Sequence, residues 1–221
     1  MTKQIRTVLP RSQWDSVRLY ENHEPLVELR EDKNIILAKG IKHYTSSFFV
    51  REQVAEKLLN VSLALRPTYK LVIIEGFRDM VSQQQEWDRV FEEIKNTDRS
   101  FSDEAIEQKV RMLVAKPHPL ANHHCGGAID VTLAYEDNTF VDMGTPYISQ
   151  ITDLNDRGKI PMLSPEITKV QQRNRFILRM HMEEEGFVWY PGEWWHYCFG
   201  DRMWAVYSQQ MIAIYGSIEL K

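Results

Sequence analysis

The segment Gly127-Ala-Ile-Asp-Val-Thr-Leu-Ala-Tyr135, written GAIDVTLAY, decides the fold that the sequence predicts. Its residues alternate as in a β-strand, so that Ala128, Asp130 and Thr132 share one face. A second segment, KLVIIEG (70–76), is rich in β-branched residues and predicts a buried strand. The protein is therefore expected to be built around a sheet that carries an aspartate on one of its strands.

Further helices and strands are predicted on both sides of these two strands. NIILAKG (34–40) is typical of a short strand closed by a glycine, and FVWY with WWHYCFG is typical of a hairpin. The longest predicted helix has Pro165 at its start and Gly186 as its C-cap. Helices are predicted at 51–67, where Pro67 ends the helix, and at 79–95, 103–115 and 165–186. This mixed order indicates an α+β fold, with a small sheet packed under helices.

Length and charge limit the classes of protein that the chain can belong to. We expect one domain, 1–221, in which residues 1–33 form an N-terminal extension packed on the rest. The 27 basic and 31 acidic residues give a net charge of −4, with a pI near 6.0. This balance provides no general attraction for nucleic acid or for an anionic membrane, so neither partner is predicted.

The lack of long apolar runs and the low number of cysteines lead us to expect a cytoplasmic protein. No apolar run approaches the roughly 20 residues that span a bilayer, and the first residues lack the apolar core of a secretory signal. Two cysteines, Cys125 and Cys198, are too few for a disulfide framework. We expect both to be reduced packing residues, although their position two residues after candidate metal ligands also allows contact with each other or with the metal.

The stretch HPLANHHCGGAIDVTL (118–133) contains the first candidate metal ligands. Neutral imidazole and ionised carboxylate are good zinc ligands, and a catalytic zinc usually takes three protein ligands. His123 and Asp130 are seven residues apart, so they meet only if the chain bends, which Gly126 and Gly127 permit. A third ligand must come from elsewhere, and His196 is the best candidate.

The stretch GEWWHYC (192–198) places a glutamate, two tryptophans and a histidine side by side. On a strand Glu193 and His196 would point to opposite faces, but Glu193 follows a Pro-Gly turn and can lean toward the histidine. A carboxylate held beside a metal can take a proton from a water molecule. The stretch is thus expected to supply a ligand and a general base, with tryptophans forming the pocket wall.

Other interpretations of these residues compete with a metal site. A single histidine is usually structural or exposed, and the tryptophan pair could belong to the core alone. His124 neighbours His123 but faces the other way, so we expect it to be solvated or to support a ligand. No role is assigned to His23, His43, His118 or His181.

Four blocks of the sequence resemble the D-alanyl-D-alanine dipeptidases of the VanX type, within the zinc D,D-peptidases of peptidase family M15. HHCGGAID (123–130) is similar to the pattern H-x-x-G-x-A-x-D, and the stretch ending in EWWHY is similar to the E-W-W-H block. The resemblance covers roughly residues 34–200, and its two metal blocks are together highly specific. EGFR (75–78) and VDMGTPY (141–147) match two further blocks of the family in the expected order.

The resemblance implies a fold, a metal and a mechanism. The implied fold is hedgehog/D,D-peptidase-like, with a small, mainly antiparallel sheet and helices packed on it. One Zn²⁺ per chain is expected on His123, Asp130 and His196. Glu193 is implied as the general base, and Arg78 is implied to face the scissile carbonyl, where a guanidinium stabilises negative charge. The implied activity is hydrolysis of D-Ala-D-Ala or a similar small D,D-dipeptide.

Some positions depart from the family pattern. Ala121 occupies the place of a serine that is associated with the C-terminal carboxylate of the dipeptide. Asn122 could donate an amide hydrogen to that carboxylate instead, and Trp195 is the other candidate for substrate binding. The segment IKHYTSSFF (41–49), which shapes the pocket in relatives, matches only loosely. The chemistry is therefore predicted more firmly than the substrate, and no oligomeric state is predicted.

Three other functions compete with a dipeptidase. A D,D- or L,D-carboxypeptidase or endopeptidase would cut longer peptidoglycan peptides, but the sequence shows no export signal. A non-catalytic zinc-binding module should have lost the base or the arginine, yet Glu193 and Arg78 are both present. A purely structural domain would leave the coincidence of both metal blocks unexplained.

Overall fold

The computed structural model describes residues 7–40, 48–97, 100–111, 114–118, 121–147 and 154–218. His43 and most of the loosely matching segment 41–49 lie outside these residues. The larger elements are the strands β3 (Ile35–Leu37), β5 (Tyr69–Glu75), β6 (Ala128–Tyr135), β7 (Val188–Trp189) and β8 (His196–Cys198), and the helices α2 (Glu52–Ala64), α3 (Met80–Thr97), α4 (Asp103–Arg111) and α5 (Lys169–Glu184). Smaller elements are α1 (Arg11–Asp15), β1 (Arg18–Leu19), β2 (Leu26–Glu28), β4 (Phe49–Arg51), α6 (Arg202–Tyr207) and β9 (Ile212–Ala213).

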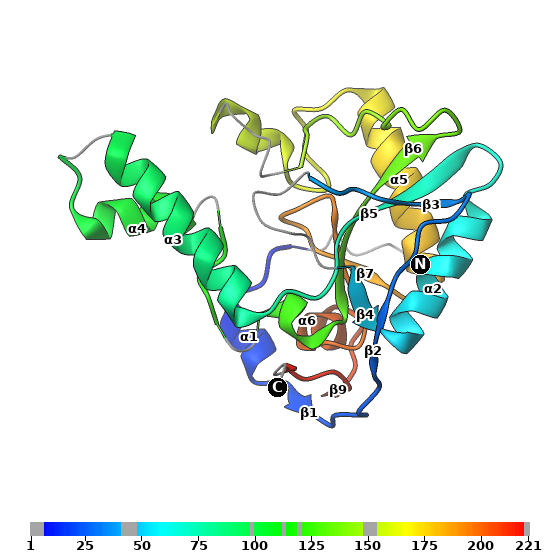
Figure 1. Cartoon of the computed structure of the whole chain (residues 1–221), viewed down its shortest axis with the longest axis horizontal. Helices are drawn as coiled ribbons and strands as arrows, with labels where there is room; N and C mark the ends of the chain where they lie inside the picture. The colour runs from blue at the N-terminus through cyan, green and yellow to red at the C-terminus, as the bar shows by residue number, and fades with distance from the viewer. Residues whose placement is uncertain are drawn as a thin grey trace.

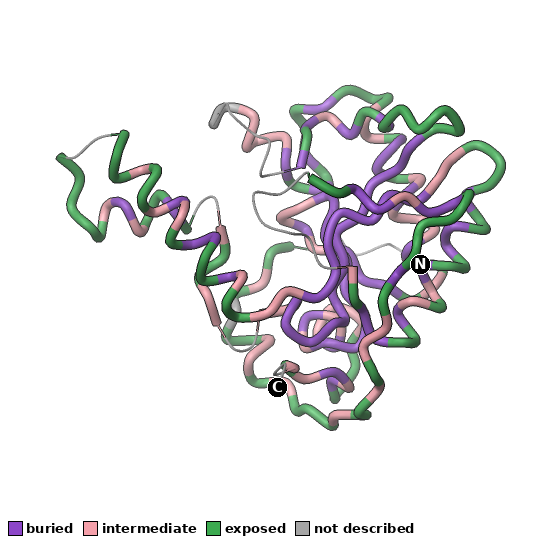
Figure 2. The backbone as a smooth tube through the Cα atoms, viewed as in Figure 1, coloured by how far each residue is buried: buried purple, intermediate pink, exposed green. Residues whose placement is uncertain are grey.

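A five-stranded sheet in the order β3-β5-β6-β8-β7 forms the centre of the molecule (Figure 1). β3 runs parallel to β5, and the other three pairings are antiparallel. Figure 2 shows that burial concentrates on β5 and β6, which lie in the interior of the sheet. This arrangement confirms the predicted α+β fold, with a small, mainly antiparallel sheet and a β7–β8 hairpin.

Helix α5 covers one face of the sheet. Tyr197 pairs with Ile129 on β6 and with Trp189 on β7, so these side chains share that face. The indole N–H of Trp189 donates to Glu183 of α5 at 2.9 Å, which places the helix over them. α2 packs beside α5 with Val54, Leu58 and Val61 fully buried. Because strand side chains alternate, the opposite face is left to Asp130 and His196.

The long helix begins later than the sequence predicts. We expected it to start at Pro165, but α5 starts at Lys169 with Thr168 as its N-cap. Thr168 and Gln171 form a capping box, in which each side chain bonds to the other's backbone N–H. The two bonds satisfy the backbone N–H groups of Thr168 and Gln171, which would otherwise lack a partner at the start of the helix. The expected end is confirmed, because Gly186 follows the helix with a positive φ of 84°.

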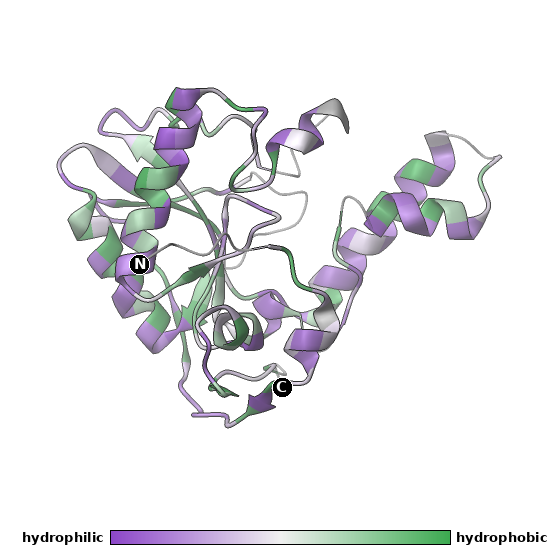
Figure 3. Cartoon of the chain, turned by 180° about the vertical axis from the view of Figure 1, so that it is seen from behind, coloured by the Kyte–Doolittle hydropathy of each residue, from purple (hydrophilic) through white to green (hydrophobic). Residues whose placement is uncertain are grey.

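Helices α3 and α4 form an arm that projects to one side of the sheet (Figure 1). The predicted helix at 79–95 is confirmed, whereas that at 103–115 is shorter, ending at Arg111 before two residues outside the described part. The arm has its own small apolar cluster of Trp87, Val90, Ile106 and Val110. Figure 3 shows hydrophilic residues interspersed with hydrophobic ones along the helices of the arm. The chain enters this arm after Arg78 and leaves it before His123.

The N-terminal segment from residue 7 packs on the C-terminal part of the chain. β1 pairs in parallel with β9, and α1 contacts α6. Arg202 of α6 donates to the carbonyl oxygens of Asp15 and Val17, both at 2.7 Å. These contacts agree with a packed extension, while the single domain over 1–221 stays a prediction. No helix among the described residues is long and apolar enough to cross a membrane.

A buried arginine of α5 joins two loop segments around the sheet. Arg175, 1% exposed, donates to the carbonyl oxygens of Met143, Pro161 and Lys159, each at 2.7 Å. Its guanidinium also lies 5.5 Å from the ring centre of Trp194. Burial lowers the pKa of Arg175 to about 10, so it stays charged at neutral pH. One side chain thus fixes the loops on either side of Trp194.

We expect Arg175→Leu to destabilise the protein by on the order of 3 kcal/mol, because three buried carbonyl oxygens lose a charged donor. The measurement is the free energy of unfolding in urea. Arg173→Leu, at an exposed position of the same helix, is the matched control and should change it by less than about 0.5 kcal/mol. Equal effects of the two substitutions would contradict the role given to Arg175.

Candidate active site

The pairing of β6 with β8 places two candidate ligands opposite each other. Asp130 and His196 are direct cross-strand partners, so their side chains leave the same face of the sheet. His196 Nδ1 lies 2.9 Å from Asp130 Oδ1. Sixty-five residues separate the two positions in the chain, and the antiparallel register brings them together.

His123 reaches the same point from a short 3₁₀ turn, η1 (Asn122–Cys125), that precedes β6. Gly126 ends this turn with φ of 73°, which confirms the predicted bend in the chain. A Cβ at Gly127 would lie 2.3 Å from the carbonyl oxygen of Phe199, so only glycine fits there. His123 Nδ1 hydrogen-bonds to the carbonyl oxygen of Gly76 at 2.7 Å, so this nitrogen carries the proton and Nε2 is left as an acceptor or ligand.

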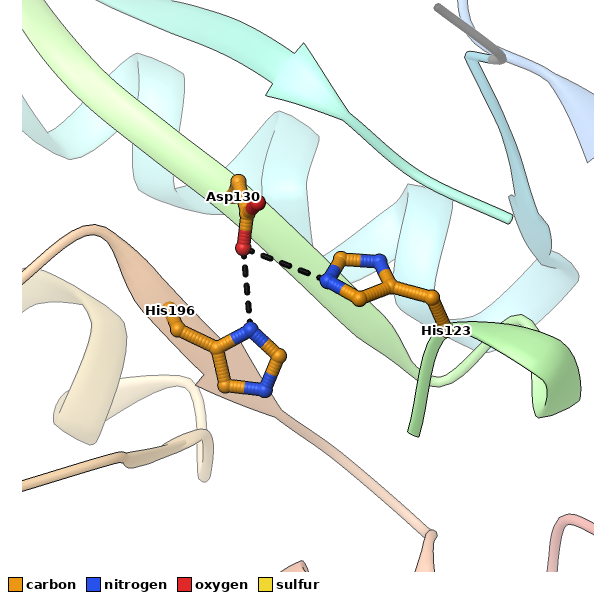
Figure 4. A group of neighbouring side chains, drawn as sticks. All are labelled: His123, Asp130 and His196. Atoms are coloured by element: carbon orange, nitrogen blue, oxygen red, sulfur yellow. Dashed lines mark hydrogen bonds and ion pairs between the residues drawn. The ribbon is translucent and has the colours of Figure 1, made fainter. Parts of the chain in front are cut away.

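Ligand atoms of His123, Asp130 and His196 converge on one point (Figure 4). His123 Nε2 lies 3.3 Å from Asp130 Oδ1, the oxygen that His196 Nδ1 also approaches. All three residues are buried, and their ligand atoms lie within 4.8 Å of one another. Two imidazole nitrogens and one carboxylate oxygen are the donor set of a catalytic zinc site. The residues therefore fit a zinc ion.

The titration of these groups follows from their burial and mutual contacts. Burial lowers the pKa of His123 to about 4, although Asp130 opposes the shift. Burial also lowers the pKa of His196, but the hydrogen bond and charge of Asp130 outweigh it and raise that pKa above its usual value. Burial raises the pKa of Asp130, and the two histidines more than reverse this. Near pH 6 the cluster thus holds an ionised aspartate, a neutral His123 and a protonated His196.

Glu193 lies beside this cluster and outside its ligand set. The residue belongs to the turn between β7 and β8, where its N–H donates to the Tyr190 carbonyl oxygen at 3.3 Å. Its carbonyl oxygen accepts the N–H of His196, and its charge contributes to the raised pKa of His196. The predicted turn position, from which a carboxylate can lean toward the histidine's face, agrees with this arrangement.

Arg78 is held at the end of β5 by two polar partners. Its guanidinium forms a bidentate ion pair with Glu75, which is completely buried, and it donates to Gln83 Oε1 at 2.5 Å. The Arg78 N–H donates to the carbonyl oxygen of His123 at 3.1 Å. The arginine is therefore fixed to the same backbone that positions the first histidine. Glu75 and Gln83 were not predicted from the sequence, although Glu75 lies within the EGFR block.

Tyr147 is a further residue that the sequence analysis did not identify. Its hydroxyl donates to Asp130 Oδ2 at 2.7 Å, the carboxylate oxygen that faces away from the histidines. Tyr147 also lines a cavity of about 320 Å³ over Ile74 and Thr132. Because Thr132 shares a strand face with Asp130, this cavity lies on the same side of the sheet as the cluster. The signal in the sequence was the VDMGTPY block, which ends at Tyr147.

The structure also describes the surroundings of the other residues that the sequence analysis singled out. Asn122 directs its amide nitrogen at the sulfur atoms of Cys198 and Met203, both at 3.4 Å. Trp195 is 1% exposed and packs on Tyr147. His124 is buried and bonds to the carbonyl oxygen of Arg78, so the expectation of a solvated ring is wrong. Cys125 and Cys198 are buried free thiols, as expected, and Cys198 Sγ lies 3.3 Å from His196 Nε2.

Residues 33–215 match the family of D-ala-D-ala dipeptidases. A D-alanyl-D-alanine dipeptidase of Synechocystis sp. is 31% identical over 79% of this chain and 81% of its own length. The D-alanyl-D-alanine dipeptidase of Escherichia coli is 25% identical over 73% of this chain and 72% of its own length. The chain belongs to the D-Ala-D-Ala dipeptidase family. Membership establishes a peptidase of this family, as the four sequence blocks predicted.

Two solved structures are similar to this chain. The vancomycin-resistance D,D-pentapeptidase VanY in complex with Zn(II) is 14% identical, covers 90% of this chain and 92% of its own, and superposes with a TM-score of 0.49. The LD-carboxypeptidase LdcB is 19% identical, covers 87% of this chain and 78% of its own, and has a TM-score of 0.43.

We expect Tyr147→Phe to weaken zinc binding by about 10-fold, because hydrogen bonds to the outer atoms of a metal ligand orient it. Zinc affinity is measured by competition with a chromophoric chelator. Tyr135→Phe, at the exposed end of β6, is the matched control and should bind zinc as the unmodified protein does. Unchanged affinity in Tyr147→Phe would show that the hydroxyl does not support the ligand.

Zinc binding at pH 6 is expected to release about one proton, because His196 is protonated there and must lose a proton to become a ligand. His123 contributes little, since its pKa of about 4 leaves it neutral at this pH. Calorimetry in buffers of different ionisation enthalpy measures the proton count. A count near zero at pH 6 would contradict the protonation states given above.

Proposed function

We propose that this protein is a zinc-dependent dipeptidase that hydrolyses D-Ala-D-Ala or a similar small D,D-dipeptide. The observation that carries the proposal is the convergence of His123, Asp130 and His196 on one buried point, with Glu193 beside it. Family membership and the activity named for its relatives support the reaction class. One zinc ion is proposed for the three ligand atoms, and when bound it would polarise the scissile carbonyl and make a water molecule more acidic.

Glu193 is proposed as the general base. Its place on a turn leaves its carboxylate outside the ligand set and close enough to influence His196 electrostatically. A carboxylate in this position accepts a proton from the attacking water and returns it to the leaving amine. The same group therefore serves both halves of the reaction.

Arg78 is proposed to stabilise the negative charge that develops on the carbonyl oxygen. A guanidinium remains charged at every working pH and has five N–H donors. The ion pair with Glu75 and the bond to Gln83 fix the orientation of this guanidinium. Such a preorganised donor typically contributes on the order of 100-fold or more to turnover. Glu75 and Gln83 then act on the reaction through Arg78.

The substrate is proposed to be small because the ligand atoms are deeply enclosed. His123 and His196 are only 8% and 7% exposed, so a peptide bond must enter a confined site to be cut. The cavity of about 320 Å³ beside Tyr147 offers space on the same face of the sheet. The relative named VanY in the solved structures is described as a pentapeptidase, so a longer peptide is the alternative that the substrate comparison must exclude.

We expect Glu193→Gln to bind zinc but to lose on the order of 100- to 10,000-fold in turnover, because the amide cannot accept the proton. Amine release from D-Ala-D-Ala and zinc content are measured on the same preparation. Glu136→Gln, in an exposed turn after β6, is the control and should be fully active. Turnover retained by Glu193→Gln would remove the general base from the proposal.

The substrate class is tested with zinc-loaded protein on D-Ala-D-Ala, L-Ala-L-Ala and a pentapeptide ending in D-Ala-D-Ala. Hydrolysis of the D,D-dipeptide alone, abolished by a chelator and restored by zinc, is the expected result. Release of D-alanine from the pentapeptide would instead assign the protein to the carboxypeptidases. Zinc binding without turnover of any peptide would favour a non-catalytic zinc-binding module.

A further inference from the structure

The short turn η1, which carries His123, has few hydrogen bonds of its own. Figure 4 shows His123 extending from this turn toward Asp130. Within the turn, the N–H of His124 donates to the carbonyl oxygen of Ala121 at 3.0 Å. The N–H of Gly126 donates to the carbonyl oxygen of His123 at a longer 3.4 Å. A single 3₁₀ turn has poorer hydrogen-bond geometry than an α-helix, so other segments must hold η1 in its orientation.

Four successive carbonyl oxygens of the turn and its C-cap accept hydrogen bonds from outside the turn. Their donors belong to β4, to the residues that follow β5 and to the C-terminal segment. The bonds run from the Arg78 N–H to His123 at 3.1 Å, from the Ile218 N–H to His124 at 2.8 Å, from Arg51 Nε–H to Cys125 at 2.8 Å and from the Arg51 N–H to Gly126 at 2.9 Å. Arg51 supplies two of these four donors, so it holds two consecutive residues of the chain that leads from His123 into β6.

The guanidinium of Arg51 also binds the N-terminal extension and the C-terminal segment. Arg51 is the last residue of β4 and is only 4% exposed. Its guanidinium donates to the carbonyl oxygens of Glu24 and Gly216, the second at 3.2 Å. The same group forms an ion pair with Glu21 at 3.2 Å and lies 5.1 Å from the ring centre of Tyr215. One buried side chain therefore joins η1 to segments from both ends of the chain.

The N-terminal extension also packs directly against the turn. Leu26 of β2 is the cross-strand partner of Arg51 on β4. A Cβ at Gly126 would lie 2.5 Å from Leu26 Cδ2, so the strand and the turn are in close contact there. The hydroxyl of Tyr215 donates to Glu24 Oε2 at 2.8 Å, which ties the C-terminal segment to the same extension. The two ends of the chain thus meet each other at the turn that carries His123.

We propose that a terminal clasp, made of Arg51, residues 21–26 and residues 215–218, holds η1 in place and so sets how tightly the site at His123 binds a metal ion. The clasp supplies no ligand, and its members are positioning residues that act through His123. When the clasp is loosened, His123 Nε2 lies beside Asp130 for a smaller fraction of the time. The apparent metal affinity then falls with that fraction, because only the correctly oriented turn completes the ligand set.

We expect Arg51→Met to lower zinc affinity by about 10-fold, because methionine keeps much of the side chain's length but has no N–H to donate. Zinc affinity is measured by chelator competition on the full-length protein. Arg202→Met is the matched control: it loses the two bonds to Asp15 and Val17, which join the same chain ends without touching η1, and should bind zinc as the unmodified protein does. The visible spectrum of cobalt-loaded protein, which reports ligand geometry, should change in Arg51→Met alone.

A second pair of variants tests the clasp without changing a charged residue. Ile218→Pro removes the backbone N–H that His124 accepts, whereas Ile218→Ala shortens the side chain and keeps that N–H. We expect zinc affinity to be about 5-fold lower in Ile218→Pro than in Ile218→Ala, the effect of one net hydrogen bond. Equal losses of affinity in both arginine variants, or unaltered affinity in folded Arg51→Met, would overturn the proposal. If Arg51→Met does not fold, equal affinities in the two Ile218 variants overturn it.

The inference rests on ligation of the metal by His123, as in the proposed function, but not on peptidase activity. Zinc affinity and the cobalt spectrum are measured without any peptide. A protein whose zinc affinity depends on Arg51 but which cleaves no dipeptide would overturn only the proposed function. A zinc-dependent dipeptidase whose zinc affinity is the same with and without the Arg51 and Ile218 donors would overturn only this inference.

Discussion

The antiparallel pairing of Asp130 with His196 is the constraint on which the rest of the site depends. The pairing register of two strands cannot shift even by one residue, because such a shift would move every side chain of the strand to the opposite face of the sheet. The apolar side chains of Ile129 and Tyr197 must face α5, so Asp130 and His196 are forced to the other side together. The packing that stabilises the sheet therefore also sets the separation of two ligand atoms, and the glycine turn has only to bring in His123.

Most of the buried polar groups that surround the site have a hydrogen-bond partner. An unpaired buried donor or acceptor costs roughly 1–3 kcal/mol, and an unpaired charge costs more. Arg175 is the partner of three loop carbonyl oxygens, and Glu75 is the partner of Arg78. For the three candidate ligands His123, Asp130 and His196 the partners are a backbone carbonyl oxygen, a tyrosine hydroxyl and a thiol. The partners that lower the cost of burial also fix the orientation of the groups that are proposed to perform the chemistry.

The sequence predicted what depends on local pattern and missed what depends on distant contacts. Alternation in 127–135 and the glycines before it were enough to predict the strand and the bend that join His123 to Asp130. The helix start at Pro165 was wrong, because the Thr168–Gln171 capping box competes successfully with a proline signal. Tyr147 and Gln83 could not be assigned, since tyrosine and glutamine are common and their roles follow only from their contacts with Asp130 and Arg78 in the folded chain. The family resemblance located the blocks that contain or adjoin some of them without giving these contacts.

The charges around His123, Asp130 and His196 can be balanced either by a bound metal ion or by a proton. Asp130, Glu75 and Glu193 are three carboxylates, and Arg78 is a fixed positive charge. A divalent ion together with Arg78 would balance the three carboxylates, which removes most of the cost of enclosing them. In the metal-free protein the raised pKa of His196 supplies part of that balance with a proton. A metal ion and a proton would thus compete for Nδ1 of His196, the ring nitrogen that lies beside Asp130 Oδ1.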